Sequence, residues 1–140
     1  MSAKVFVDTN ILVYAHDIKA GDRHEAAKRI VLELRQTRLG VVSMQVLQEF
    51  YSTVTRKLAK PLPKADARAI VEDFALWCIA TTPEEIKQAF RIEDEARIGF
   101  WDALIVAAAI KSGAKRILSE DLNHGQTIAG VQIENPFAIR

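Results

Sequence analysis

The sequence predicts an α/β fold in which helices flank a central, mostly parallel sheet of four to five strands. Short runs of β-branched residues alternate with longer segments whose apolar residues recur at helical spacing. Because two parallel strands must be joined by a long crossover, this alternation favours a parallel sheet with helices on both faces. Residues 100–111 are apolar on almost every side, which is typical of a helix buried at the centre of such a fold.

The N-terminal segment predicts a strand followed by two helices. Residues 4–7 are rich in β-branched and aromatic side chains, which is typical of a buried strand. The side-chain oxygen of Thr9 or Asn10 would cap a helix over residues 11–17. A second helix is predicted over residues 22–38, where alanine, isoleucine, valine and leucine form an apolar stripe.

The middle of the chain repeats this pattern. Gly40 ends the second helix, and a β-branched strand is predicted over residues 41–43. Ser43 would cap a helix over residues 44–58. The two prolines of residues 61–63 then mark a turn, because proline cannot continue a helix interior.

The second half of the chain supplies the remaining strands. Thr82 is followed by a proline and two glutamates, which is a strong signal for the start of a helix. The predicted elements are a helix over residues 67–77, a brief strand over 78–80, helices over 82–97 and 100–111, and strands over 116–119 and 131–134. No repeat or linker interrupts the chain, so we expect one domain over residues 1–140.

Composition sets the limits on function. The 19 basic and 18 acidic residues give a net charge of +1, which excludes a polybasic nucleic-acid binder but leaves room for a local basic patch. Cys78 is the single cysteine, so no intramolecular disulfide is possible and a reducing compartment is favoured. The start lacks the apolar core of a signal peptide, and no apolar run reaches the ~20 residues of a membrane span. We expect a cytoplasmic protein with no membrane segment.

Four acidic residues border apolar segments that belong to a core. They are Asp8, Glu49, Asp102 and Asp121. A desolvated carboxylate must be paired, hydrogen-bonded or bound to a metal. Asp8 and Asp121 each follow a predicted strand, so the topology places both at the carboxyl edge of the sheet, where ligands bind in parallel α/β folds. Glu49 interrupts the apolar surface of its helix and Asp102 begins the most buried helix, and both can face that edge.

Such a cluster predicts a metal site. Neighbouring carboxylates raise one another's pKa, and a divalent cation removes this repulsion. Ligands that are all oxygens favour Mg²⁺ or Mn²⁺, and no cysteine or histidine cluster has zinc spacing. We expect Asp8 and Asp102 to be direct ligands, and Glu49 and Asp121 to bind a second metal or act through water. The chemistry suits hydrolysis of a phosphodiester. The structural alternative is that each acid is only a helix cap or a turn former.

Four short motifs carry these acids along the chain. They are Val7-Asp8-Thr9-Asn10-Ile11-Leu12, Ser43 with Glu49, Phe100-Trp101-Asp102-Ala103-Leu104-Ile105, and Ser119-Glu120-Asp121-Leu122. In this order they resemble the acidic motifs of PIN-domain ribonucleases, and most of all those of VapC-type toxins from bacterial toxin–antitoxin pairs. The segments 123–126 and 135–137 are also similar to that group, so the resemblance covers essentially the whole chain.

The resemblance implies a PIN fold, an endoribonuclease that depends on Mg²⁺ or Mn²⁺, and neutralisation by a cognate VapB-like antitoxin. It assigns the acidic positions to the four acids above and makes Asn10 and Ser119 supporting polar residues that orient ligands or water. It also points to a homodimer, for which we expect the helices around residues 47–58 and 67–77 to provide apolar surface. Gly99 stands where a serine-like cap is expected, which glycine can replace.

Two other functions compete with this one. The first is an inactive PIN-like module that binds RNA or protein without cleaving it. The second is a phosphotransfer enzyme with Asp8 as nucleophile, but such a site needs either a second aspartate two residues later, where this chain has Asn10, or adjacent acids near the N-terminus. Among other residues, His124 is expected to be a packed loop histidine, with contact to phosphate or to the metal's outer shell as the alternative. Trp101 is expected to pack in the core rather than to stack on a base.

Overall fold

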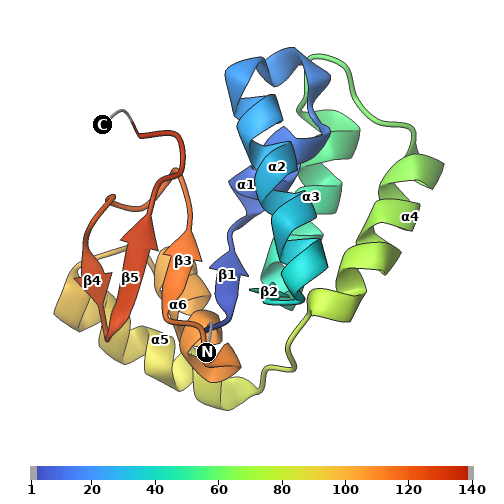
Figure 1. Cartoon of the computed structure of the whole chain (residues 1–140). Coiled ribbons are helices and arrows are strands. Elements are labelled where there is room, and N and C mark those ends of the chain that lie inside the picture. Colours follow the sequence, from blue (N-terminus) through green and yellow to red (C-terminus); the bar gives the residue numbers. More distant parts are fainter. Residues whose placement is uncertain (1–2, 139–140) are drawn as a thin grey trace.

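The computed structural model describes residues 3–138 and contains one five-stranded sheet with the order β2-β1-β3-β5-β4 (Figure 1). The strands are β1 (Val5–Val7), β2 (Gly40–Val41), β3 (Arg116–Leu118), β4 (Thr127–Ile128) and β5 (Val131–Glu134). All neighbours are parallel except β4, which runs antiparallel to β5. The predicted α/β fold with a mostly parallel sheet is therefore confirmed.

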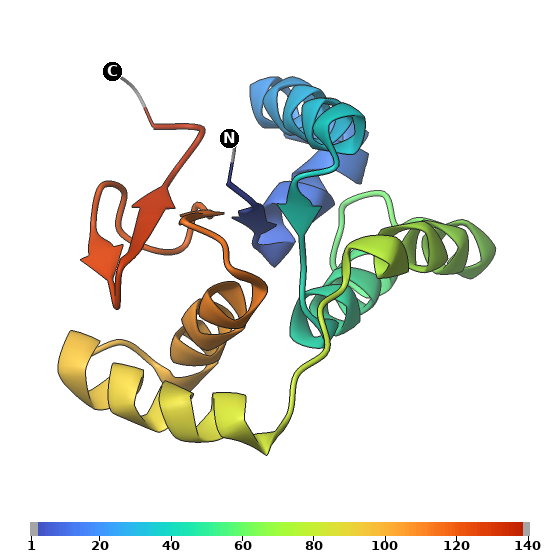
Figure 2. The same cartoon turned by 60° about the horizontal axis from the view of Figure 1, so that its bottom comes forward.

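Within residues 3–138, six α-helices surround this sheet. They are α1 (Thr9–His16), α2 (Asp22–Thr37), α3 (Met44–Arg56), α4 (Lys64–Phe74), α5 (Pro83–Ala96) and α6 (Phe100–Ser112), with 3-10 turns η1 (Ile18–Ala20) and η2 (Ala75–Trp77). Figure 2 shows α5 and α6 on one side of the sheet and α2 on the other. The prediction of helices on both faces is thus confirmed. Among residues 3–138, no helix is both long and apolar enough to span a membrane.

The core lies between α6 and the central strands. Phe6, Ile117 and Ile133 on β1, β3 and β5 are fully buried. The helix α6 faces them with several alanines, among them Ala103 and Ala107, whose small side chains let it lie close to the sheet. This confirms that residues 100–111 form the most buried helix.

Two of the predicted helix caps are confirmed and one is wrong. Ser43 Oγ accepts a hydrogen bond from Val46 N at 3.4 Å, and Thr82 caps α5 through a reciprocal pair of bonds with its first turn. At α1, however, the cap is Asp8 rather than Thr9 or Asn10, because Asp8 Oδ1 accepts from Thr9 N at 2.7 Å. The side chains of residues 9 and 10 are therefore available for other contacts.

Gly40 does not end α2 as predicted. The helix ends at Thr37, and Arg38 takes the left-handed conformation at its C-cap. Gly40 instead begins β2, where a Cβ atom would lie 2.5 Å from the Trp77 ring. The glycine is thus required by close packing of an aromatic side chain against the strand.

The short strands differ most from the prediction. The brief strand expected at residues 78–80 is reduced to one parallel bridge between Val42 and Cys78. The strand β4 was not predicted, because it has only two residues. Its turn to β5 places Ala129 and Gly130 at φ of 49° and 85°, a hairpin geometry that an Ala-Gly pair signals far less clearly than Asn-Gly does.

Candidate active site

Asp8 lies at the carboxyl end of β1 and is almost completely buried, with 6% of its surface exposed. Its Oδ1 caps α1, and its Oδ2 accepts a hydrogen bond from Ser119 Oγ at 2.7 Å. Ser119 follows β3, the neighbouring strand, and is fully buried. Two adjacent strand ends therefore share one short hydrogen bond, and the carboxylate of Asp8 is held in a single orientation.

Asn10 connects Asp8 to Asp121. Its Nδ2 lies 3.2 Å from Asp121 Oδ2 and 3.5 Å from Asp8 Oδ2, while its Oδ1 accepts from Glu120 N at 3.0 Å. Ser119 Oγ also accepts from Asp121 N at 3.1 Å. The two predicted supporting residues thus join the loop after β3 to the start of α1.

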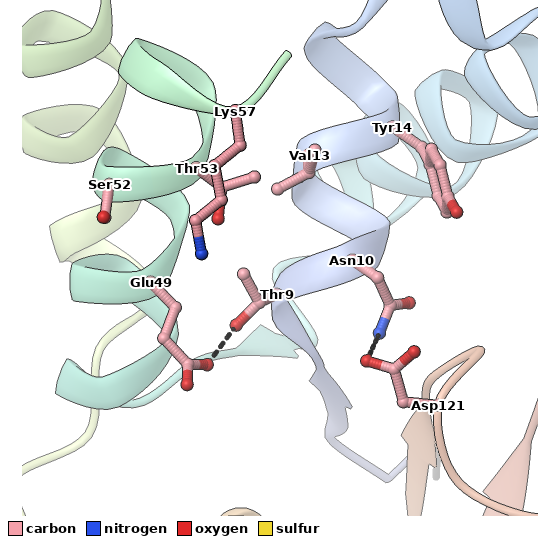
Figure 3. Close-up of a pocket in the computed structure, with 9 residues that line it drawn as sticks. All are labelled: Thr9, Asn10, Val13, Tyr14, Glu49, Ser52, Thr53, Lys57 and Asp121. Atoms are coloured by element: carbon pink, nitrogen blue, oxygen red, sulfur yellow. Dashed lines mark hydrogen bonds between the residues drawn. The ribbon is translucent and has the colours of Figure 1, made fainter.

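Glu49 belongs to α3 and approaches from the opposite side of α1. Thr9 Oγ1 donates to Glu49 Oε1 at 2.9 Å, which Figure 3 shows together with the Asn10–Asp121 bond. Gln45 Nε2 donates to Glu49 Oε2 at 3.4 Å and to the carbonyl oxygen of Trp101 at 3.3 Å. Gln45 thereby ties α3 to the first turn of α6, next to Asp102.

Asp102 lies in the first turn of α6 and is partly buried. Its pKa is raised, first by burial and then by the negative charges of Asp121 and Glu49. Those two acids come from different parts of the chain, and their common effect on Asp102 shows that the three carboxylates lie within electrostatic range of one another. The four predicted acids are therefore gathered at one edge of the sheet.

Burial raises the pKa of Asp8 to about 6. Its hydrogen bonds from Ser119 and Thr9 lower this pKa, whereas the negative charges of Asp121 and Glu49 raise it further. The balance shows that the hydrogen bonds do not fully replace the lost hydration of the carboxylate. A positive charge placed among these acids would favour the ionised form of Asp8.

The donor set fits a hard divalent cation in its chemistry. All candidate ligands are oxygens, and they repel one another. As the side chains stand, however, no three acidic, histidine or cysteine residues within 3–138 converge closely enough to hold one ion. The separate hydrogen bonds of Glu49 to α1 and of Asp121 to Asn10 explain this spread, because each holds its carboxylate against a neighbouring side chain.

A second network, which the sequence reasoning missed, supports the loop after β3. Glu120 accepts hydrogen bonds from Tyr14 OH and from Arg23 Nε, both at 2.6 Å. The first bond is the main cause that raises the pKa of Tyr14 to about 12. Glu120 stands inside a recognised motif, but nothing in the sequence indicates that residues of α1 and α2 would hold it.

A cleft of about 410 Å³ opens beside the acids between α1 and α3 (Figure 3). Its lining residues are Thr9, Asn10, Val13, Tyr14, Glu49, Ser52, Thr53, Lys57 and Asp121. Two of the four acids, Glu49 and Asp121, thus border the cleft. Hydroxyl groups from both helices also line it.

One side chain lies elsewhere than predicted. Trp101 is 64% exposed rather than packed in the core. His124 has a structural contact, since its Nδ1 accepts from Asn135 N at 2.9 Å. It lines a separate cavity with Arg29 and Arg116, away from the acidic cleft.

The mostly parallel sheet is covered by helices on both faces, and acidic residues follow its strands β1 and β3. The protein is therefore an α/β domain with an acidic site at the carboxyl ends of its strands. The model of the PIN domain family matches residues 5–127, and the chain therefore belongs to that family. Its sheet extends past the matched region, because β5 pairs with β3. No curated protein matches the chain significantly.

Several solved structures have the same fold. The toxin VapC20 of Mycobacterium tuberculosis, which cleaves the sarcin-ricin loop, is 21% identical, with a TM-score of 0.62 over 84% of this chain and 90% of that one. A toxin–antitoxin complex from Klebsiella pneumoniae gives 18% identity and a TM-score of 0.68 over 99% and 100%. The DNA-bound VapBC of Salmonella typhimurium is 22% identical, with a TM-score of 0.66 over 96% of this chain and 99% of that one.

Proposed function

We propose that this protein is a metal-dependent endoribonuclease that hydrolyses phosphodiester bonds of RNA and acts as the toxin of a VapBC-type toxin–antitoxin pair. The carrying observation is that Asp121 and Glu49 both raise the pKa of Asp8 and of Asp102, so that acids from four separate motifs lie within electrostatic range of one another. The family of the chain and its similarity to toxins of known structure support the same function.

The four acids are the proposed ligands of Mg²⁺ or Mn²⁺. A cation bound there would supply Lewis-acid stabilisation of the charge that develops on the phosphate, and would lower the pKa of an attacking water. Asp8 is the anchor, because Ser119 and Thr9 fix its carboxylate before any ligand arrives. Asn10 holds Asp121 in reach of the same space.

Other residues near the acids hold the acidic side chains and their loop in fixed positions. Thr9 of α1 and Gln45 of α3 each donate a hydrogen bond to one carboxylate oxygen of Glu49. Glu120 fixes the loop that carries Asp121 through its bonds to Tyr14 and Arg23. Such supporting contacts typically change metal affinity or activity by 10- to 100-fold when they are removed. We assign these residues to positioning rather than to contact with the RNA.

The proposed partners are an RNA substrate, a VapB-like antitoxin and a second copy of the chain. The similarity to structures of VapBC and FitAB complexes supports the antitoxin. The apolar side chains of α3 that were expected to pair in a homodimer, such as Phe50 and Val54, are buried within the monomer. Another set of apolar residues, Met44, Ile86, Phe90 and Trp101, is exposed. Met44, Ile86 and Trp101 line one cavity and Phe90 reaches Trp101 through the ring of Phe100, so the four form an apolar face that supports self-association.

We also propose that residues 1–140 form a single PIN domain that acts in the cytoplasm. The pairing of β5 with β3 supports the first point, because it places the C-terminal strand in the same sheet as the matched region. The RNA substrate and the single cysteine, which fits a reducing compartment, support the second.

The decisive experiment compares the purified wild type with Asp8→Asn on a panel of structured and single-stranded RNAs with Mg²⁺ or Mn²⁺. The wild type should cleave internal bonds, and the variant should lose this activity while its circular dichroism spectrum is unchanged. Full cleavage by Asp8→Asn would exclude the proposed site. If the wild type binds RNA but never cleaves it, the alternative of an inactive PIN-like module is correct.

A further inference from the structure

We propose that Lys57 binds a phosphate of the RNA strand next to the cleaved bond, so that the cleft between α1 and α3 is the track for the flanking nucleotides. This inference rests on the proposed ribonuclease activity and extends it to substrate binding. It concerns a residue outside the acidic motifs that lines the same cleft as Glu49 and Asp121.

The helical spacing of α3 places Lys57 on the same face as Glu49. Glu49, Thr53 and Lys57 are separated by four residues each, and side chains four residues apart lie above one another on one helix face. All three line the cleft. Because eight residues of α-helix rise about 12 Å, the backbone of Lys57 lies roughly that far along the cleft from the acid.

The side chain of Lys57 brings its charge closer to Glu49 than the backbone separation suggests. Helical side chains lean toward the N-terminus, and Lys57 keeps a helical backbone at the C-cap of α3. Figure 3 shows its ammonium group extending back along α3, above the bond between Thr9 and Glu49. The positive charge therefore lies over the cleft, close to the acids but on the side of the hydroxyl-bearing residues.

The charge of Lys57 is not used inside the described part of the protein. Within residues 3–138, four ion pairs engage Arg23, Arg35, Lys87 and Arg116, and none includes Lys57. Among the described residues that line the cleft, Lys57 alone is basic, whereas Glu49 and Asp121 are acidic. An exposed ammonium group with three donors and no carboxylate partner is suited to a phosphate oxygen.

The charge of Lys57 can attract the RNA backbone into the cleft. A cleft that contains acids repels the RNA backbone. The positive charge of Lys57 offsets this repulsion and attracts the strand that continues past the reacting bond. The neighbouring Thr53 and Ser52 add hydroxyl groups along the same wall. Together these groups let the cleft bind backbone without reading a base.

The test measures binding apart from cleavage. In an Asp8→Asn background, Lys57→Met is compared with Lys60→Met, which removes an exposed lysine three residues later that does not line the cleft. The probe is a fluorescent single-stranded oligoribonucleotide, titrated at several salt concentrations. Loss of one phosphate contact should weaken binding about fivefold near 0.1 M salt and reduce the logarithmic salt slope by about 0.7. Lys60→Met should change neither value.

A kinetic arm uses the same substitutions in the wild-type background. Lys57→Met should raise KM severalfold and leave kcat nearly unchanged, and Lys57→Arg should restore KM because it keeps the charge. If Lys57→Met matches Lys60→Met in affinity and salt slope, the inference is wrong, whatever the activity of the wild type. If the wild type cleaves no RNA while the binding difference persists, the proposed nuclease activity fails and the phosphate contact stands.

Discussion

The side-chain amide of Asn10 donates a hydrogen bond to Asp121 at 3.2 Å, although the two residues are 111 positions apart in sequence. The same amide nitrogen lies 3.5 Å from Asp8, and the amide oxygen holds the backbone of Glu120. One side chain of α1 therefore sets the distance between the acids that follow β1 and β3. This arrangement makes Asn10 the most testable of the supporting residues.

Replacement of Asn10 by alanine should lower RNA cleavage by 10- to 100-fold, because Asp121 and its loop lose their fixed position. The free energy of unfolding should fall by about 1 kcal/mol for the lost hydrogen bonds. The control is Asn123→Ala, which removes an exposed asparagine from the same loop. Equal activities of the two variants in a single-turnover assay would contradict the positioning role.

The buried Asp8 should make the stability of the metal-free protein depend on pH. Its pKa is about 6 in the fold and 3.8 in the unfolded chain, so the protonated form favours folding. This contribution is fully present below about pH 4 and is lost as the pH rises through about 6. The difference corresponds to about 3 kcal/mol.

Asp8→Asn cannot titrate at this position and should lack this dependence. Urea unfolding in the presence of a chelator, at several pH values between 4 and 7, measures both proteins. The wild type should lose stability relative to the variant as the pH rises. Parallel curves for the two proteins would show that Asp8 is ionised in the fold without a penalty.

Addition of Mn²⁺ or Mg²⁺ at pH 7 should raise the midpoint of thermal unfolding, because a ligand that binds only the folded state stabilises it. At one hundred times its dissociation constant the cation contributes about 2.7 kcal/mol. Asp8→Asn and Asp102→Asn should remove most of this shift. Asp94→Asn, which changes an exposed acid of α5, should retain it. A shift that survives in Asp8→Asn would place the cation elsewhere.

The exposed apolar face should control self-association. Phe90→Glu places a charge in this face, where Phe90 is 52% exposed, and should convert a dimer into a monomer in analytical ultracentrifugation. Leu76→Glu is the matched control, because Leu76 is 86% exposed but lies on η2, outside the face. If Phe90→Glu stays dimeric and Leu76→Glu dissociates, the interface lies near η2 instead.

Much of the fold follows from local sequence signals. The strands β1, β3 and β5 each contain buried apolar residues, and the long helical connections between β1, β2 and β3 favour parallel pairing of these three strands. The capping signals at Ser43 and Thr82 act within one helical turn, so their outcome does not depend on distant contacts. The two-residue strand β4 and the close packing of Gly40 against Trp77 do depend on such contacts, and they were not predicted.

In the candidate site, too, some features follow from local sequence and others depend on distant contacts. The sequence alone predicted the four acids, because each stands beside a strand or helix whose position is set by its apolar neighbours, and the resemblance to PIN-domain motifs added Asn10 and Ser119. Only the tertiary structure decided what holds them. Hydrogen bonds from Thr9 to Glu49 and from Tyr14 to Glu120 join elements that pack side by side, and no local pattern records which side chains meet across helices. The exposure of Trp101 and the position of Lys57 over the cleft were decided there too, since burial depends on the packing of the whole chain.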